Sequence, residues 1–186
     1  SYFFGLAAIS GGKITACGLR KDDIQGDRKF LNILQTMGCG IEWQKDSVTV
    51  TGPKTLQAGN FDMNDITDVV PTLAVCALFA EGETVISNVA HMRLKECDRL
   101  TVLTKELSKV GGIVEEYNDG LKIQGNCGRI TGAEIDPHDD HRIAMASSLL
   151  MVKTDHMTIT NPSCVNKTYP DFFSTLESVT LKGILS

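Results

Sequence analysis

The sequence feature that most constrains the fold is an internal repeat. Two stretches align without a gap: MGCGIEWQKDSVTVTG, which starts at Met37, and VGGIVEEYNDGLKIQG, which starts at Val110. Each follows an amphipathic segment and places a glycine, Gly38 or Gly111, where a helix ends in the left-handed conformation. Each then gives two short runs around a turn, QKDS or YNDG, whose composition is typical of a β-hairpin. The repeat therefore predicts two helix–hairpin units.

Apolar segments precede these units and extend the repeat. They are apolar nearly all round, so as helices they would be buried on every side. Each is followed by a segment that reads as a strand, and the spacing of 70 to 73 residues between copies indicates repeated subdomains. The predicted helices are YFFGLAAI (2–9), VVPTLAVCALFA (69–80) and IAMASSLLMV (143–152), and the predicted strands are KITACGL (13–19), ETVISNV (83–89) and HMTITNP (156–162).

These units predict an α/β fold with pseudo-threefold packing, in which the three apolar helices lie inside and the sheets outside. Nearly three units are present, and no linker separates them, so we expect residues 1–186 to form one domain. The opening SYFFGLAAISGG reads as the middle of a buried helix. We therefore expect the chain to be part of a larger protein, truncated on its N-terminal side.

Composition narrows the possible partners. Hydrophobic residues make up 42% and charged residues 22% of the chain, as in ordinary globular proteins. The net charge of −5 argues against nucleic-acid and membrane-surface binding, and no apolar run approaches the roughly 18 residues of a membrane span. The six cysteines are scattered without a C-x-x-C pair, which favours reduced cysteines in a cytosolic protein over disulfides or zinc.

Basic residues occur at the expected starts of helices, where the helix dipole disfavours them. Arg93, Lys95 and Arg99 precede the amphipathic helix that ends at Val110, and on a helix Lys95 and Arg99 would share one face. Arg142 lies in the first turn of the third apolar helix. Any one of these cations is more simply explained as a solvated surface charge.

Lys167 adds a third such place, because it precedes the helix announced by YPDFF. Cations at three helix starts favour an anionic ligand held between them and the backbone N–H groups. We therefore predict a ligand that carries phosphates or carboxylates.

Acidic residues mark the same places. Asp68 and Asp140 occupy expected N-cap positions of two buried helices, a structural role that leaves open a second role as a general base. The cluster HDDH, His138–His141, also permits a divalent metal site. Adjacent residues point in different directions, however, so we predict no metal here.

Three segments together resemble the signature blocks of the EPSP synthase (3-phosphoshikimate 1-carboxyvinyltransferase) family. They are DMNDITDVVPTLAVCALFAEGETVISNVAHMRLKECDRL, DDHRIAMASSLL and CVNKTYPDFF. The resemblance implies an inverse α/β barrel: two similar domains, each made of three β-α-β-α-β-β units around three buried helices. This chain would be most of one domain, and the partner domain would be absent from it.

The resemblance also implies a reaction. The family, which glyphosate targets, transfers the enolpyruvyl group of phosphoenolpyruvate to the 5-hydroxyl of shikimate 3-phosphate and releases phosphate. It needs no metal and no organic cofactor, and it works in the cytoplasm or, in plants, in the plastid. Both substrates are polyanions.

Carried over residue by residue, the resemblance implies these roles. Catalytic residues would be Asp68, Glu96, Lys95 and His141; Asp68, Lys95 and His91 would contact shikimate 3-phosphate; and Arg99, Arg142, Lys167 and Asp140 would bind phosphoenolpyruvate. Three positions depart from the family pattern: His91 replaces an asparagine, Cys97 a threonine and Asp139 an asparagine. The departure at His91 puts its substrate contact in question.

Other functions remain open at this point. The related UDP-N-acetylglucosamine enolpyruvyl transferase matches the KECDR and DDHR segments less closely. A metal-dependent hydrolase would use the HDDH cluster, and a catalytically silent domain would only bind anions. The isolated chain is expected to be inactive, because the family's active site lies between two domains.

Overall fold

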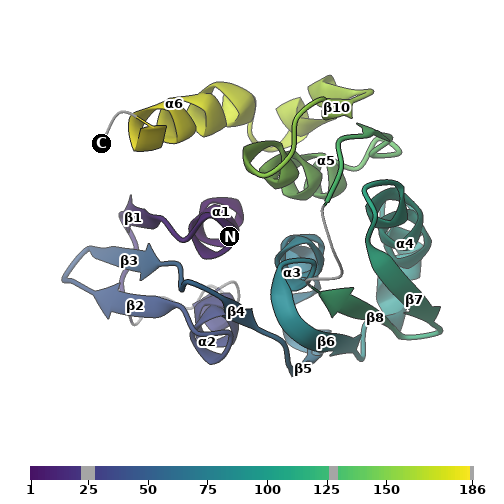
Figure 1. Cartoon of the computed structure of the whole chain (residues 1–186), viewed down its shortest axis with the longest axis horizontal. Coiled ribbons are helices and arrows are strands. Elements are labelled where there is room, and N and C mark those ends of the chain that lie inside the picture. Colours follow the sequence, from purple (N-terminus) through teal and green to yellow (C-terminus); the bar gives the residue numbers. More distant parts are fainter. Residues whose placement is uncertain (22–27, 126–129, 185–186) are drawn as a thin grey trace.

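The computed structural model describes residues 1–21, 28–125 and 130–184. Helices and groups of strands follow one another along these ranges (Figure 1). In order, the elements are α1 (Tyr2–Ser10), β1 (Lys13–Cys17), α2 (Lys29–Thr36), β2 (Gly40–Trp43), β3 (Ser47–Thr51), β4 (Leu56–Gln57), β5 (Asn60–Asp62), the 3-10 helix η2 (Asn64–Val69), α3 (Val70–Ala77), β6 (Ala80–Ser87), η3 (Ala90–Leu94), α4 (Arg99–Lys109), β7 (Ile113–Tyr117), β8 (Gly120–Gly125), β9 (Glu134–Ile135), α5 (His141–Ser148), η4 (Leu149–Val152), β10 (Thr158–Ile159), η5 (Pro162–Lys167) and α6 (Phe172–Ile184).

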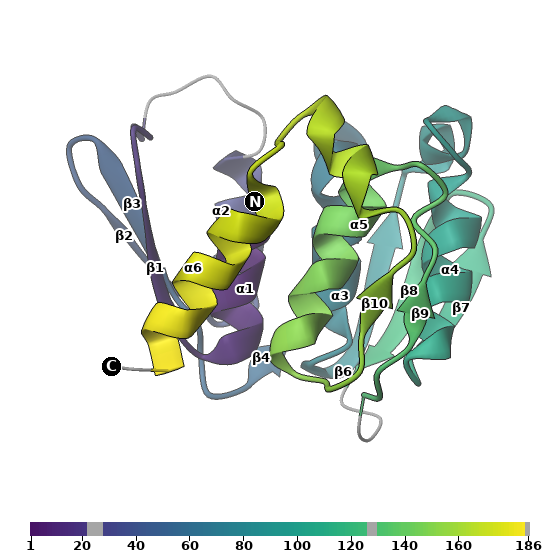
Figure 2. The same cartoon turned by 90° about the horizontal axis from the view of Figure 1, so that it is seen from above.

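The three predicted apolar helices are confirmed, and they lie side by side inside the molecule (Figures 1 and 2). α3 contacts both α1 and α5, and α1 contacts η4, the continuation of α5. Gly5 allows a close approach of α1 to α3, because a Cβ there would lie 2.6 Å from the Thr72 Cγ2 atom. Every residue of α3 is buried, as its apolar sequence predicts.

Both predicted hairpins are confirmed, and each joins a third strand in the same order. One sheet runs β1-β3-β2 and the other contains β6-β8-β7, and all of these pairings are antiparallel. Gly38, with φ 102°, and Gly111, with φ 93°, directly follow the C-cap residues of α2 and α4. These positive φ values are why glycine recurs at this point of the repeat.

Parallel pairs complete the unit. β5 pairs with β6 across α3, and β9 pairs with β10 across α5, so the second unit reads β-α-β-α-β-β from β5 to β8. Some predicted bounds were wrong. The second apolar helix ends at Ala77, three residues early, and the strand after it begins at Ala80. The predicted strand at 156–162 is reduced to Thr158–Ile159.

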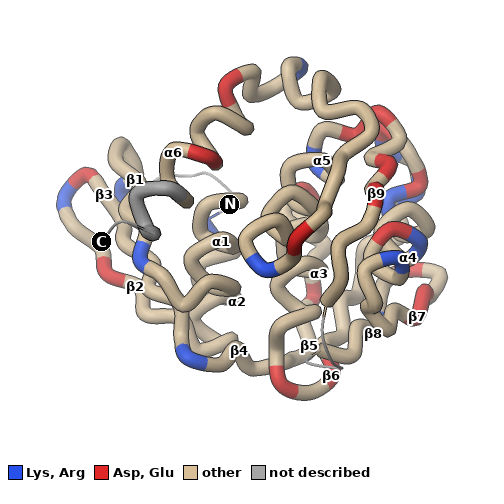
Figure 3. Tube along the Cα trace, turned by 45° about the horizontal axis from the view of Figure 1, so that its top comes forward, with Lys and Arg blue, Asp and Glu red and all other residues tan. Residues whose placement is uncertain are grey.

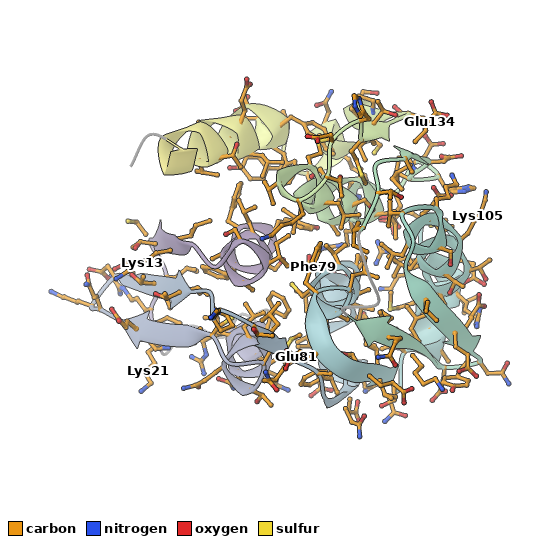
Figure 4. All side chains as sticks on the ribbon, in the orientation of Figure 1. Lys13, Lys21, Phe79, Glu81, Lys105 and Glu134 are labelled. Atoms are coloured by element: carbon orange, nitrogen blue, oxygen red, sulfur yellow. The ribbon has the colours of Figure 1, made fainter. Side chains whose placement is uncertain are left out.

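The core is continuous across the described residues and draws on every unit. Most charged residues lie in loops and outer elements, and α1 and α3 carry none (Figure 3). Side chains fill the space around the central helices, and labelled Lys13 and Lys105 lie at the periphery (Figure 4). No helix in the described ranges combines the length and apolar character needed to cross a membrane. The five described cysteines are free, and Cys127 lies outside the described residues.

Candidate anion-binding active site

The starts of the three buried helices face one region. Tyr2 opens α1, Asp68 lies just before α3, and Asp140 and Arg142 begin α5. An ion pair of 2.7 Å between Arg142 Nη2 and Asp68 Oδ2 joins the starts of α3 and α5. On α1, the positive charge of Arg142 lowers the pKa of Tyr2, against the effect of burial. Each helix start carries partial positive charge, so their convergence favours an anion.

Arg99, the first residue of α4, is the centre of the site. Its side chain is only 1% exposed, and three carboxylates surround it. Nε donates to Asp140 Oδ2 at 2.6 Å, Nη2 to Glu96 Oε2 at 2.8 Å, and Nη1 to Asp68 Oδ1 at 3.4 Å. A guanidinium is suited to this role because its fork of N–H groups serves several oxygens at once. Arg99 therefore connects the carboxylates of three separate segments.

The predicted N-cap at Asp140 is confirmed. Its Oδ1 accepts from the backbone N–H groups of Arg142 and Ile143, and its side chain is fully buried. The two residues before it, His138 and Asp139, have φ values of 50° and 59°, which turn the chain so that Asp140 enters α5 in an extended conformation. Asp140 therefore caps the helix and pairs with Arg99 at once.

The predicted N-cap at Asp68 was wrong. Asp68 lies inside η2, which runs directly into α3 with Val69 as the flanking residue. Its carboxylate instead pairs with Arg142 and Arg99. Pro71 lies in the first turn of α3, where a backbone N–H would have no hydrogen-bond partner within the helix. Proline is therefore tolerated at this position. The tertiary ion pairs thus replace the local capping role.

Glu96 is the second accessible carboxylate. Its Oε1 lies 3.3 Å from Lys167 Nζ, while Oε2 accepts from Arg99. Partial burial would raise the pKa of Glu96, but a backbone hydrogen bond, Arg99 and Lys167 outweigh it and hold the pKa below its usual 4.5. Glu96 is therefore ionised at neutral pH in the unliganded site.

His141 is buried beside this carboxylate. Its Nδ1 lies 4.0 Å from Glu96 Oε1 and has no hydrogen-bond partner among the described residues. Desolvation first, and then the charge of Arg142, lower the pKa of His141 below its usual 6.5. The imidazole is therefore neutral at pH 7, and its unpartnered nitrogen is available to a ligand proton or to Glu96.

Two predicted site residues stay outside this network. His91 and Lys95 are exposed on and just after η3, and within the described ranges no side-chain hydrogen bond or ion pair links them to the site. The prediction that Lys95 and Arg99 share a helix face was wrong, because Lys95 has an extended backbone and α4 begins only at Arg99. Asp98 caps α4, accepting from the Thr101 N–H.

Arg93, predicted among the cations at this helix start, is a structural residue. It donates to Asp98, to Glu116 and to the Asn118 and Tyr117 carbonyl oxygens. These bonds tie η3 and α4 to the β7–β8 turn. Arg93 is thus fully engaged away from the site.

The HDDH cluster divides between separate tasks. His138 lies 3.7 Å from Asp136, Asp139 accepts from Asn161, and Asp140 serves Arg99. In the part of the chain that the structure describes, no three His, Cys, Asp or Glu residues gather as metal ligands would.

Two residues near the site were missed as contributors. The Cys97 thiol donates to Asp140 Oδ2 over 3.7 Å, so this departure from the family pattern lies at the site. The Tyr2 hydroxyl is buried near Arg142. The sequence signal that could have identified Tyr2 is a hydroxyl group at the first position of an otherwise largely apolar helix.

Chemically, the site is a set of cations already paired with carboxylates. Three cations, Arg99, Arg142 and Lys167, face three carboxylates, those of Asp68, Glu96 and Asp140. Arg142 and Lys167 are the accessible cations, with side chains 25% and 63% exposed. An incoming anion would compete with Asp68 and Glu96 for them.

Comparison with known proteins identifies a family that matches nearly the whole chain. A model of the family described as EPSP synthase (3-phosphoshikimate 1-carboxyvinyltransferase) matches residues 1–176. The chain is 47% identical over 174 residues to the 3-phosphoshikimate 1-carboxyvinyltransferase of Nostoc punctiforme, covering 94% of this chain and 40% of that protein. It is 45% identical to the chloroplastic one of Brassica napus, covering 97% of this chain and 36% of that protein. The chain thus spans about 40% of the length of such relatives.

Solved structures show the same fold. An EPSP synthase from Acinetobacter baumannii superposes with a TM-score of 0.81 at 27% identity, covering 92% of this chain and 42% of that one. The enolpyruvyl transferase NikO from Streptomyces tendae superposes with a TM-score of 0.78 at 19% identity, covering 95% of this chain and 41% of that one. The likeness to NikO bears on the fold alone.

Proposed function

The chain belongs to the EPSP synthase family, and from that premise we propose that it supplies part of an active site for enolpyruvyl transfer. The substrates are phosphoenolpyruvate and shikimate 3-phosphate, and a second domain of the same enzyme supplies the remaining contacts. Residues 1–186 act as one domain of that enzyme, which works in the cytoplasm or, in a plant, in the plastid. The reaction needs no cofactor, metal, nucleic acid or membrane.

One observation carries the proposal: each proposed proton carrier is paired with one accessible cation. Asp68 lies 2.7 Å from Arg142, and Glu96 lies 3.3 Å from Lys167. Buried Arg99 links the two pairs. An anion that binds Arg142 and Lys167 therefore frees one oxygen of each carboxylate, Asp68 Oδ2 and Glu96 Oε1, for proton transfer.

The first step adds the substrate hydroxyl to C2 of phosphoenolpyruvate. Asp68 takes the hydroxyl proton, an O–C2 bond forms, and C3 receives a proton from Glu96 to become a methyl group. Lys167 is one cause of the low pKa of Glu96. When Lys167 turns to the ligand, the pKa of Glu96 rises, so that its carboxyl can carry that proton.

The second step expels phosphate from the tetrahedral intermediate. The bond from C2 to the phosphate oxygen breaks, and the leaving phosphate takes up the proton that Asp68 accepted in the first step. Glu96 recovers a proton from C3 as the double bond re-forms. Arg142 and Lys167 bind the phosphate and carboxylate, with Arg99 and Asp140 behind them; cations fixed in place beforehand stabilise the developing charge. Lys95, His91 and His141 complete the proposed contacts.

An assay of phosphate release from phosphoenolpyruvate tests this function in the full-length protein that contains the chain. Release must require shikimate 3-phosphate. Glu96→Gln and Lys167→Ala are each expected to lower kcat/KM by at least about 100-fold, the scale of general acid–base catalysis. Lys45→Ala, in the exposed β2–β3 turn, is the matched control and should leave the rate unchanged.

Other outcomes assign a different function. Turnover only with a UDP-amino sugar would point to the related transferase. Stoichiometric metal in the purified protein, together with hydrolytic activity, would point to a hydrolase. Phosphate binding without any turnover would leave an anion-binding domain.

A further inference from the structure

The hydroxyl of Tyr2 is a buried polar group that the proposed chemistry does not use. It is shielded from solvent and makes no hydrogen bond of normal geometry within the described residues. Buried hydroxyl groups in folded proteins nearly always have a partner. A buried hydroxyl without a partner beside an active site therefore indicates that its hydrogen bond forms in another arrangement of the site.

Aromatic packing fixes the position of this hydroxyl. The Tyr2 ring meets Phe172 edge-on, with centroids 5.6 Å apart and planes at 76°. Phe172 is fully buried and also contacts Phe3 and Tyr169. Because this cluster joins the start of α1 to the start of α6, the Tyr2 ring cannot turn its hydroxyl toward solvent without disrupting the packing.

Arg142 is the neighbour that can supply the partner. Burial raises the pKa of Tyr2 to about 12, and the charge of nearby Arg142 and its N–H groups oppose that rise. Arg99 and Asp140 also face the phenol, with opposite effects. The phenol is thus neutral at pH 7, and its oxygen can accept a hydrogen bond from a guanidinium.

We propose that Tyr2 is a positioning residue that holds Arg142 in its anion-bound orientation. In the unliganded site Arg142 Nη2 donates to Asp68 at 2.7 Å. When Arg142 leaves Asp68 for an anion, the Tyr2 hydroxyl accepts one of its five N–H groups and the anion takes others. Asp68 is thereby released, and neither the guanidinium nor the hydroxyl remains unpaired. The inference rests on the proposed function only in placing an anion at Arg142.

The test uses this chain, inorganic phosphate as the probe, and titration calorimetry with NMR of the arginine side chains. Tyr2→Phe keeps the ring and removes the hydroxyl. Tyr169→Phe is the matched control, because it removes a hydroxyl from the same aromatic cluster, where it bonds Thr175 at 3.3 Å. Phosphate is expected to move the Arg142 resonances. Tyr2→Phe should weaken binding about three- to tenfold, the net scale of one intramolecular hydrogen bond, and Tyr169→Phe should not.

A double-mutant cycle separates positioning from general loss of structure. If Tyr2 acts through Arg142, Tyr2→Phe causes no further loss of phosphate affinity in an Arg142→Gln background. An equal loss in both backgrounds, an unchanged affinity in the single variant, or Arg142 resonances that phosphate does not move would each overturn the proposal.

This test and the turnover assay can fail independently. If phosphate binding depends on Tyr2 but the full-length protein shows no enolpyruvyl transfer, the proposed reaction is wrong and the proposed role of Tyr2 stands. Transfer activity with a Tyr2→Phe protein that binds phosphate normally would do the reverse.

Discussion

Arg99 brings a full positive charge into the interior, where its three carboxylate partners offset the loss of hydration. The pair with Asp140 is buried on both sides. Such a pair is costly to break from one side, because the remaining charge stays buried without compensation. The same residue thus supports the fold and organises the site.

Arg99→Ala is expected to lower the free energy of unfolding by about 3–5 kcal/mol. Lys167→Ala removes an exposed cation from the same network and should change it by less than about 1 kcal/mol. Urea unfolding of both variants measures the contrast. Similar values for the two would show that Arg99 is not a structural charge.

His141 predicts a pH dependence of stability. Its pKa is lowered in the folded state, so below its usual 6.5 the unfolded chain binds a proton that the folded chain does not. The stability that the neutral imidazole contributes is therefore fully present above pH 6.5 and is lost as the pH falls toward the lowered pKa. Urea unfolding between about pH 5 and 7 should show this slope, weakened in His141→Gln and kept in a variant of exposed His91, His91→Asn. A slope that persists in His141→Gln belongs to another group.

At the scale of elements, Asp68 and Asp140 carry the same N-cap pattern in the sequence, but only Asp140 caps its helix. Before α5, left-handed His138 and Asp139 reverse the chain, and Asp140 is free to cap. Before α3, the 3-10 helix η2 continues into the α-helix, with only Ile66 leaving helical geometry, and Asp68 has no extended position from which to cap. The difference lies in the preceding backbone, which an N-cap pattern does not describe.

The helix–hairpin connection supports a prediction with an internal control. Gly38 has φ 102°, where a Cβ is strained, whereas Gly40 lacks a positive φ and an added Cβ there would meet only ordinary contacts at 3.6 Å. Gly38→Ala should destabilise the protein by about 1–2 kcal/mol, and Gly40→Ala by much less. Thermal unfolding of both variants tests this prediction. Equal decreases in Tm would contradict the explanation by backbone conformation.

At the scale of the molecule, the packing of α1, α3 and α5 brings their starts to one region and so creates the site. The described residues place Arg142 and Lys167 at its accessible side. If a second domain completes this site, the chain alone retains cations without the full set of substrate contacts.

The isolated chain is therefore expected to bind phosphate weakly and to release none from phosphoenolpyruvate. Its affinity for shikimate 3-phosphate should be weaker than micromolar, because most of the proposed contacts belong to the other domain. Turnover measured on the chain alone, before and after addition of the rest of the enzyme, tests this. Activity of the chain by itself, or micromolar binding, would contradict a divided site.

The three apolar helices, the two helix–hairpin units and their order could be predicted from the sequence. The apolar runs favour helices that are buried on all sides, and Gly38 and Gly111 mark helix ends because other residues are strained at a positive φ. The cations Arg142 and Lys167 were also readable, since positive charge at a helix start is unfavourable without an anion. These signals are local, and local backbone and hydration physics is sufficient to interpret them.

The ion-pair partners of the charged residues became known from the tertiary structure and not from the sequence. Arg99 lies 31 residues from Asp68 and 41 from Asp140 along the chain. From the sequence alone, any other carboxylate was an equally good candidate partner. Tyr2 gained its position near Arg142 through a ring contact with Phe172, at the far end of the chain. Such pairings depend on burial and distance, and those quantities exist only once the three helices have packed.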